Sequence, residues 1–257
     1  MYCKSDLTQP GERRYLYDGS LAGFYCCVYA SVYGKEIPYD ILPEEAAEPS
    51  LFEDVFIATD PVRAKRVRAS VAEKVSPRAQ ELLENVFCSC LAGKERKMLL
   101  FLLRAYREGG AILRALGRAD VAELLRAEGH LLNERHLLLG FVRFSDYDGV
   151  LGATITPKNF ILPYIAGHFV TRYRNEDFII VDKTHRAALF YLNGERRIAR
   201  VEEAVFPEAS ETEERYRALW KKFYRTIAIK ERENPRCRMT HMPKRYWENM
   251  TEMREYL

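Results

Sequence analysis

The sequence predicts an α+β protein in which an N-terminal strand–helix unit and a central helical bundle precede an antiparallel sheet. Three observations predict this class. Hydrophobic residues make up 47% of the 257 residues, which is enough for a sizeable core. Apolar residues recur at helical spacing through the middle of the chain. Short apolar stretches separated by turn residues follow His136, as in a sheet.

The N-terminal unit is predicted as a short strand followed by a helix. Arg14–Tyr17 forms the strand, and Asp18-Gly19 forms the turn after it. Ser20 can cap a helix over Leu21–Tyr33, and Gly34 suits its left-handed C-terminal cap.

Three tyrosines of this helix, Tyr25, Tyr29 and Tyr33, are spaced at i, i+4 and i+8 and therefore share one face. Two interpretations stay open for them. They are either a half-buried edge of the core or a surface on which nucleic-acid bases stack.

Residues 35–60 are interpreted as an acidic, proline-rich connection with one short strand at Val55–Ala58. The stretch from Asp40 to Asp60 holds seven acidic residues and no Lys or Arg. After it, the apolar spacing predicts three helical segments, at about Asp60–Lys74, Ser76–Tyr106 with a break near Gly93, and Ala111–His136.

The remaining elements follow in the order β-β-α-β-β-β. The strands are predicted at Leu138–Phe144, Val150–Thr156, Phe178–Asp182, Ala187–Leu192 and Arg196–Val201, with a helix over Leu162–Arg174. Asn193-Gly194 is a strong hairpin signal because both central residues of that turn need a positive φ. We divide the chain into residues 1–136 and 137–257, which we expect to form one integrated globular domain.

A long helix is predicted to begin after Ser210, which forms a capping box with Glu213. Its expected core face consists of Tyr216, Leu219, Phe223 and Ile227. From Arg215 to the end, twelve Lys and Arg face five Glu, a local charge of +7. This segment is therefore a candidate for binding an anionic partner.

Pro243 can open a helix that places Lys244 and Arg245 in its first turn. Cations are unfavourable at that end of a helix dipole, and a bound phosphate would relieve the conflict. Trp247 beside them could stack on a base. The alternative is a C-terminal helix held by Tyr246 and Trp247 in the core, with its charges in water.

Further candidate residues lie in the sheet region. Arg143 is predicted inside a strand between two aromatic residues, where it could reach an anion or an internal carboxylate. His168 and Arg172 are neighbours at i and i+4 on one helix and could bind a phosphate together. Asp182 and His185 share one turn and are candidate acid–base residues, although such a turn is often structural.

Several classes are disfavoured. The six cysteines include no C-x-x-C pair, so we expect no metal site, and no motif predicts a cofactor. No apolar run reaches the ~20 residues of a membrane span. The first residues lack an apolar signal core, so we expect a cytoplasmic protein that does not bind membranes.

Five stretches together resemble a family of bacterial proteins described as DNA metabolism or DNA repair proteins, which contain an uncharacterised domain. They are Tyr17-Asp-Gly-Ser-Leu-Ala-Gly-Phe24, His136 through Gly-Phe-Val-Arg-Phe144, Ile161-Leu-Pro-Tyr-Ile-Ala-Gly-His-Phe169 with Arg172, Ile180-Val-Asp-Lys-Thr-His185, and Asn234-Pro-Arg236 through Met-Pro-Lys-Arg-Tyr-Trp247. The resemblance implies a gene beside one for a radical S-adenosylmethionine (radical SAM) protein with helix-hairpin-helix DNA-binding elements. It also implies relatives fused to uracil-DNA-glycosylase-like domains.

Our first hypothesis is a DNA-binding accessory protein in DNA repair or modification that acts with the radical SAM protein. The residues expected to contact nucleic acid are Arg143, His168, Arg172, Arg236, Lys244, Arg245 and Trp247. A second hypothesis is a DNA-processing enzyme, for base excision or nucleotide modification, with Asp182, His185 or His168 as acid or base. A third is a protein–protein interaction module whose acidic 40–60 segment binds a basic partner.

Overall fold

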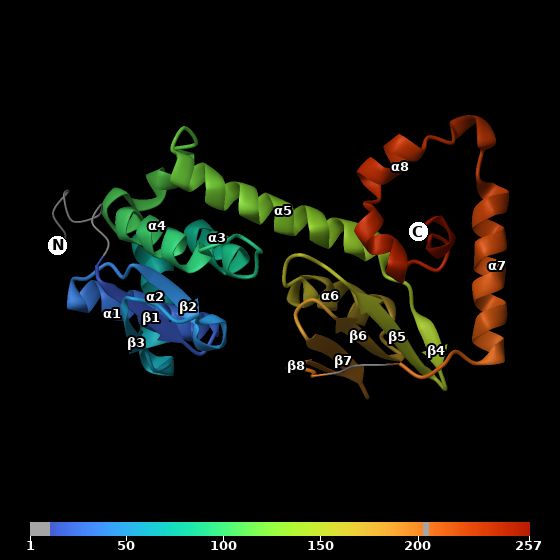
Figure 1. Ribbon diagram of the computed structural model, residues 1–257, viewed down its shortest axis with the longest axis horizontal. Helices are drawn as coiled ribbons and strands as arrows, with labels where there is room; N and C mark the ends of the chain where they lie inside the picture. Colours follow the sequence, from blue (N-terminus) through green and yellow to red (C-terminus); the bar gives the residue numbers. More distant parts are fainter. Residues whose placement is uncertain (1–10, 203–205) are drawn as a thin grey trace. The chain divides into compact units, whose positions relative to one another are not determined.

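The computed structural model describes residues 11–202 and 206–257 (Figure 1). It combines helices with two sheets and confirms the α+β class. The chain forms two compact units, the first ending at Leu131 and the second spanning Leu132–Leu257. The boundary lies within one long helix, α5 (Ala119–Phe141), which also contains residue 136, where the sequence was divided.

The sheet of the first unit has three parallel strands in the order β2-β1-β3, with β1 (Arg13–Tyr17) in the centre. The helix α1 (Leu21–Gly34) follows β1 and leads to β2 (Asp40–Pro43). The Ser20 hydroxyl accepts a hydrogen bond from the Gly23 amide at 2.9 Å, as a cap at this position should. The predicted strand–helix unit is therefore part of a parallel β-α-β arrangement.

Two details of the predicted N-terminal region were wrong. Lys35, with φ 52°, takes the left-handed cap position, and Gly34 is the last helical residue. The acidic segment contains two strands, because Asp40–Pro43 forms β2 before β3 (Glu53–Phe56). A strand that ends in proline gives a weak sequence signal, yet proline is tolerated at a sheet edge.

The predicted helical bundle is present, with the break near Gly93. It consists of α2 (Pro61–Lys74), α3 (Pro77–Phe87) and α4 (Lys94–Glu108), followed by a 3₁₀ helix at Gly109–Arg114 and by α5. Side chains from these helices and from α1 build the core of the first unit.

The predicted strand over Leu138–Phe144 does not form, because α5 continues to Phe141. Leu131 and Leu138 are both buried, so the apolar stripe of the helix runs on through this stretch. A short apolar run fits a buried helix as well as a strand, and here helical packing decides. Arg143 therefore lies in the connection after α5 and not inside a strand.

The second unit contains a five-stranded sheet in the order β4-β5-β6-β7-β8. Its strands are Ser145–Tyr147, Val150–Ile155, Asp177–Asp182, Ala187–Leu192 and Glu195–Arg200. The neighbours β5 and β6 are parallel, because α6 (Leu162–Arg172) connects them, so the sheet is mixed and not wholly antiparallel. Asn193 and Gly194 have φ of 52° and 79°, which confirms the predicted hairpin.

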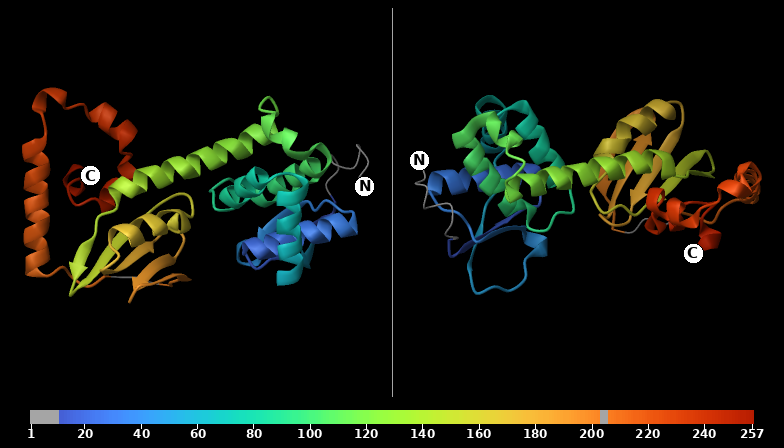
Figure 2. Two further views of the ribbon diagram at one scale, coloured as in Figure 1. Left: turned by 180° about the vertical axis from the view of Figure 1, so that it is seen from behind. Right: turned by 90° about the horizontal axis from the view of Figure 1, so that it is seen from above.

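The chain closes with α7 (Glu211–Ile227), α8 (Pro235–His241) and the 3₁₀ helix η4 (Lys244–Asn249). Ser210 caps α7 as predicted, but the Glu213 carboxylate accepts a hydrogen bond from the Asp146 amide in β4. The face of α7 expected in the core is exposed, by 65% for Tyr216 and 52% for Phe223. α7 runs beside the C-terminal segment (Figure 2) and contacts it through Trp220 and Arg225, which bond to Glu252 and Glu255.

Among the described residues, we find no helix with both the length and the apolar character that crossing a bilayer requires.

Candidate nucleic-acid interface

An aromatic cluster fixes the connection between α5 and β4. The Phe144 ring packs edge-on against Phe169 of α6, Tyr173 at the end of α6, and Phe178 of β6, with centroid distances of 5.5, 5.0 and 5.8 Å. These contacts hold the neighbouring Arg143 beside the C-terminal end of α6. The position of Arg143 is therefore fixed by Phe144, the aromatic residue that follows it in the sequence.

Arg143 and Arg172 line one groove of about 550 Å³, which we call the α6–α7 groove. Tyr173, Tyr216 and Trp220 contribute aromatic rings to it, and Arg217 adds a third guanidinium. The volume lies within the range of about 300–1,000 Å³ that ligand pockets occupy. The groove thus brings together two of the predicted nucleic-acid-binding residues, from segments that are 29 residues apart in the chain.

Polar contacts to β4 hold the α7 wall of the groove. Arg217 donates hydrogen bonds to Ser145 Oγ at 2.8 Å and to Glu213 Oε1 at 2.9 Å. The Glu213 carboxylate in turn accepts from the Asp146 amide at 3.2 Å. Because these side chains connect one turn of α7 to β4, they fix the position of the α7 wall, which carries Tyr216 and Trp220.

Arg143 is paired with a carboxylate of its own unit. Its Nε and Nη2 contact Glu252, with 2.6 Å between Nη2 and Oε1, and the guanidinium carbon lies 5.6 Å from the Trp220 ring centre. Trp220 Nε1 also donates to Glu252, at 2.8 Å. Burial alone would raise the pKa of the Glu252 carboxyl, but the bonds from Arg143 and Trp220 outweigh burial and lower it.

Arg172 differs from Arg143 in this respect. It is exposed at the end of α6, with its guanidinium carbon 5.7 Å from the Tyr173 ring centre. Within the described part of the chain, no carboxylate pairs with it. Its charge is therefore available to a ligand phosphate.

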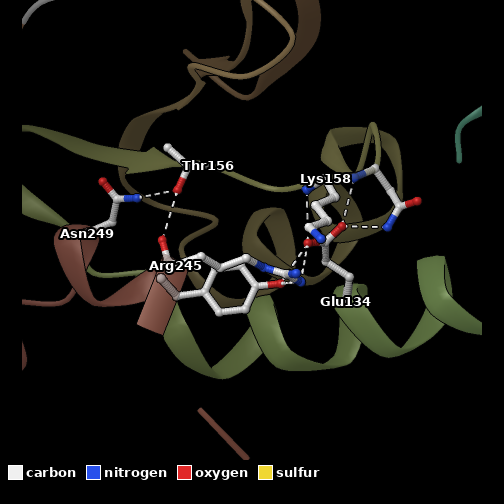
Figure 3. Close-up of polar contacts among 7 residues, drawn as sticks. Glu134, Thr156, Lys158, Arg245 and Asn249 are labelled. Carbon is white, nitrogen blue, oxygen red and sulfur yellow. Dashed lines mark hydrogen bonds and ion pairs between the residues drawn. The ribbon is translucent and has the colours of Figure 1, made fainter. Parts of the chain in front are cut away.

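A second polar network joins η4 to α5 and to residues 158–159 (Figure 3). The buried Glu134 carboxylate of α5 accepts from the Lys158 and Asn159 amides, at 3.0 and 2.8 Å. It also accepts from Arg245 at 2.9 Å and from the Tyr246 hydroxyl at 2.7 Å. Burial would raise the pKa of Glu134, but these donors together lower it.

The network gives Arg245 an internal partner and buries the rings that were expected to stack on a base. Arg245 is paired with Glu134, and the Tyr246 and Trp247 rings are 2% and 5% exposed. Trp247 Nε1 donates to the Met242 carbonyl, so neither ring is available for stacking. The two aromatic residues lie in the core, as the alternative interpretation of this segment expected, but Arg245 is paired with the buried Glu134 and is not left to water.

The remaining predicted contacts lie elsewhere in the second unit. Arg236 is exposed on α8, and Lys244 lies over the Trp247 ring at 5.5 Å. His168 is exposed on α6, one turn before Arg172, and packs against Phe169. These three residues do not line the α6–α7 groove.

Asp182 and His185 form a pair at the end of β6. Asp182 is wholly buried, and its Oδ2 lies 2.7 Å from His185 Nδ1, while Oδ1 accepts from the Thr184 and His185 amides. The buried carboxylate favours a proton on Nδ1 and leaves Nε2 as the acceptor nitrogen. The His185 side chain is 27% exposed, so the pair could take up a proton from a bound molecule.

Sequence reasoning missed the carboxylates that hold the site together. Glu134 lies between Leu131 and Leu138 on the apolar stripe of α5, and a carboxylate within such a stripe signals a buried partner. Glu252 gave no comparable signal, because its partner Arg143 is 109 residues away in the sequence. Across the described residues, no group of three or more His, Cys, Asp or Glu is arranged to hold a metal ion.

Comparison with known proteins gives one match. A family described as a domain of unknown function, DUF4130, matches residues 92–252, which include every residue of the α6–α7 groove. Neither the search of curated proteins nor that of solved structures found a match.

Proposed function

The chain belongs to the DUF4130 family, and we propose that it is a nucleic-acid-binding accessory protein in DNA repair or DNA modification, acting with a radical SAM partner. The observation that supports binding is the α6–α7 groove, which is lined by three arginines and four aromatic residues. The resemblance of the chain to DNA repair proteins supports the biological setting and the partner.

The chemistry of the groove favours single-stranded nucleic acid. Unpaired bases can stack on exposed rings, whereas the bases of a duplex are already stacked on one another. Tyr216 is 65% exposed and Trp220 is 39% exposed, so both rings present surface to a ligand. Arg172 supplies a charge for the backbone phosphate next to the stacked base.

The internal ion pairs limit the electrostatic part of binding. Arg143 and Arg217 already face Glu252 and Glu213, so they release fewer counterions when a phosphate approaches. We therefore expect binding in which stacking contributes more than charge, with a moderate dependence on salt.

Fluorescence anisotropy with a labelled oligothymidylate tests the proposal on the full chain. Tyr216→Ala should weaken binding about tenfold, since loss of one base–aromatic contact costs about 1–3 kcal/mol. Arg172→Glu should also weaken it about tenfold, since it places an anion where a phosphate is bound. Both side chains are exposed, so the variants should keep the unfolding temperature of the parent. Arg196→Glu, on the edge strand β8 and outside the groove, is the matched control.

Failure of the parent chain to bind any single-stranded oligonucleotide at low salt would contradict the proposal. So would equal losses from Arg172→Glu and Arg196→Glu, because a nonspecific charge effect would then account for binding. Co-purification with a radical SAM protein from the same genome checks the partner separately.

The Asp182–His185 pair favours a second candidate, a DNA-processing enzyme in which His185 acts as the acid or base. A buried carboxylate that orients a partly exposed imidazole is an arrangement suited to proton transfer. Oligonucleotides carrying modified bases should then be converted by the parent chain but not by His185→Gln. A parent chain inert toward a broad panel would exclude this candidate and leave the accessory role.

A further inference from the structure

The first unit contains a cavity of about 490 Å³ between α1, α2 and α4, which we call the first-unit cavity. Its apolar wall comes from Val28 and Val32 of α1, Val67 of α2 and Leu103 of α4. This volume is within the range of small-molecule sites. The cavity is built by the first unit alone and is separate from the α6–α7 groove.

Two tyrosines form an aromatic platform at this cavity. The Tyr29 and Tyr33 rings stack with centroids 4.1 Å apart and an angle of 24° between their planes. Tyr33 is 60% exposed although it lies on a packed helix. The guanidinium of Arg63 lies 5.2 Å from the Tyr29 ring centre and helps to hold the platform in place. Such a platform can accept one further flat ring.

Three cationic side chains line the cavity beside the platform. Arg66 and Lys74 lie at i and i+8 on α2 and both line the cavity, as does Arg107 at the end of α4. No Asp or Glu of the described chain lines it. Neither Arg66 nor Lys74 takes part in an ion pair within the described residues. The local field therefore favours an anion beside the aromatic platform.

A pair of hydroxyl groups supplies directional polarity. Ser70 Oγ donates to the Val67 carbonyl at 2.7 Å and lies 2.7 Å from the Tyr106 hydroxyl oxygen. A serine hydroxyl has one proton, and Ser70 donates it to the Val67 carbonyl. The Tyr106 hydroxyl is therefore the donor to Ser70 Oγ. The Tyr106 oxygen then keeps a lone pair that can accept a hydrogen bond from a ligand N–H.

We propose that the first-unit cavity binds a nucleoside monophosphate. The base stacks on Tyr33, its exocyclic amino group donates to Tyr106, and the phosphate lies against Arg66 and Lys74. The same chemistry is presented by a free mononucleotide and by the 5′-phosphorylated end of a single strand. This proposal does not depend on nucleic-acid binding in the α6–α7 groove.

Isothermal titration calorimetry of the full chain with adenosine 5′-monophosphate tests the proposal. Adenosine and inorganic phosphate are titrated as separate probes. We expect the monophosphate to bind at least tenfold more tightly than either part. Tyr33→Ala and Arg66→Glu should each weaken it about tenfold, as expected for loss of a stacking ring or of a phosphate partner. Matched controls are Tyr39→Ala and Lys65→Glu, which change exposed residues outside the cavity and should stay within twofold of the parent.

Competition with a 5′-phosphorylated oligoadenylate identifies the source of the ligand. Displacement of the monophosphate by the strand assigns the cavity to strand ends, and no displacement assigns it to free mononucleotides. The proposal is overturned if the monophosphate binds no better than adenosine or phosphate, or if the controls lose as much affinity as the cavity variants. Arg172→Glu should not change the affinity for the monophosphate. Failure of the proposal for the cavity can therefore be distinguished from failure of the proposal for the groove.

Discussion

The first-unit cavity and the α6–α7 groove contain the same kinds of residue but use their charges differently. In the first-unit cavity, Arg66 and Lys74 have no carboxylate partner among the described residues. In the α6–α7 groove, Arg143 and Arg217 are paired with Glu252 and Glu213. The comparison shows that a cluster of arginines and aromatic rings identifies a ligand site only after its internal ion pairs have been subtracted.

Glu95 of the first unit and Glu134 and Glu252 of the second unit are buried carboxylates whose pKa values shift in opposite directions. Burial, as the largest cause, raises the pKa of Glu95 in the first unit, where the Tyr17 hydroxyl donates to it. In the second unit, donors outweigh burial and lower the pKa of Glu134 and Glu252. The closing segment of the second unit is therefore held by ionised groups.

The largest expected effect comes from removing Glu134. Glu134→Ala leaves five donor atoms without their acceptor, and we expect the second unit to lose about 3 kcal/mol of unfolding free energy. Trp220 and Trp247 are the two tryptophans of the sequence, so indole fluorescence during urea unfolding reports on this unit alone. Glu248→Ala, an exposed residue of the same 3₁₀ helix, should change the unfolding free energy by less than about 0.5 kcal/mol. Equal effects of the two variants would contradict the role given to Glu134.

Arg143→Gln and Arg172→Gln separate the two uses of arginine in the groove. Arg143→Gln removes the ion-pair partner of the buried Glu252, and we expect a loss of about 2 kcal/mol, below the usual cost because Arg143 is itself 25% exposed. Arg172→Gln should leave stability unchanged and weaken nucleic-acid binding instead. The same urea titration measures both variants, and a stability loss from Arg172→Gln would show that this side chain also has an internal partner.

Glu134 and Glu252 of the second unit and Glu95 of the first unit should respond to acid with opposite sign. Glu134 and Glu252 have folded-state pKa values below the ordinary 4.5, so their contribution is present above that pH and is lost as pH falls through the lowered values. Glu95 has a raised pKa, so its protonation on acidification favours the fold of the first unit.

Urea unfolding followed by indole fluorescence between pH 7 and pH 3 measures the second-unit response. We expect stability to fall below about pH 4.5, and Glu134→Gln to flatten that fall. An unchanged acid profile in Glu134→Gln would mean that other groups control the acid response.

The smallest expected effect concerns the salt dependence of strand binding. Each phosphate neutralised on a single strand contributes about −0.7 to the slope of log affinity against log salt. Arg172→Gln should therefore make the slope shallower by about 0.7, and Arg143→Gln should change it less, because Glu252 already balances Arg143. Anisotropy titrations at several salt concentrations give both slopes, and a larger change for Arg143 would reverse the assignment.

Most of the fold could be predicted from local features of the sequence. The Asn193-Gly194 hairpin, the Ser20 and Ser210 caps and the helices around Gly93 follow from residues close in the chain. The predictions were wrong where packing against other parts of the chain determines the secondary structure. Leu138–Phe144 fits either a strand or a helix by itself, and the long stripe of α5 makes it mainly helical.

The candidate site was predictable only in part for the same reason. Arg143 was identified as a cation between two aromatic residues and Arg172 as the helical neighbour of His168, and both line the groove. Whether such a cation is free depends on carboxylates distant in sequence, such as Glu252 for Arg143 and Glu134 for Arg245. Spacing within one element carries no information about those partners.

Tryptophan indole N–H signals in a two-dimensional NMR spectrum test the groove most directly. Trp220 lies in the α6–α7 groove, whereas Trp247 is buried and bonded to the Met242 carbonyl. Titration with oligothymidylate should shift the Trp220 signal in proportion to binding and leave the Trp247 signal in place. If saturating oligonucleotide leaves Trp220 unmoved, or shifts Trp247 alone, the α6–α7 groove is not the nucleic-acid site.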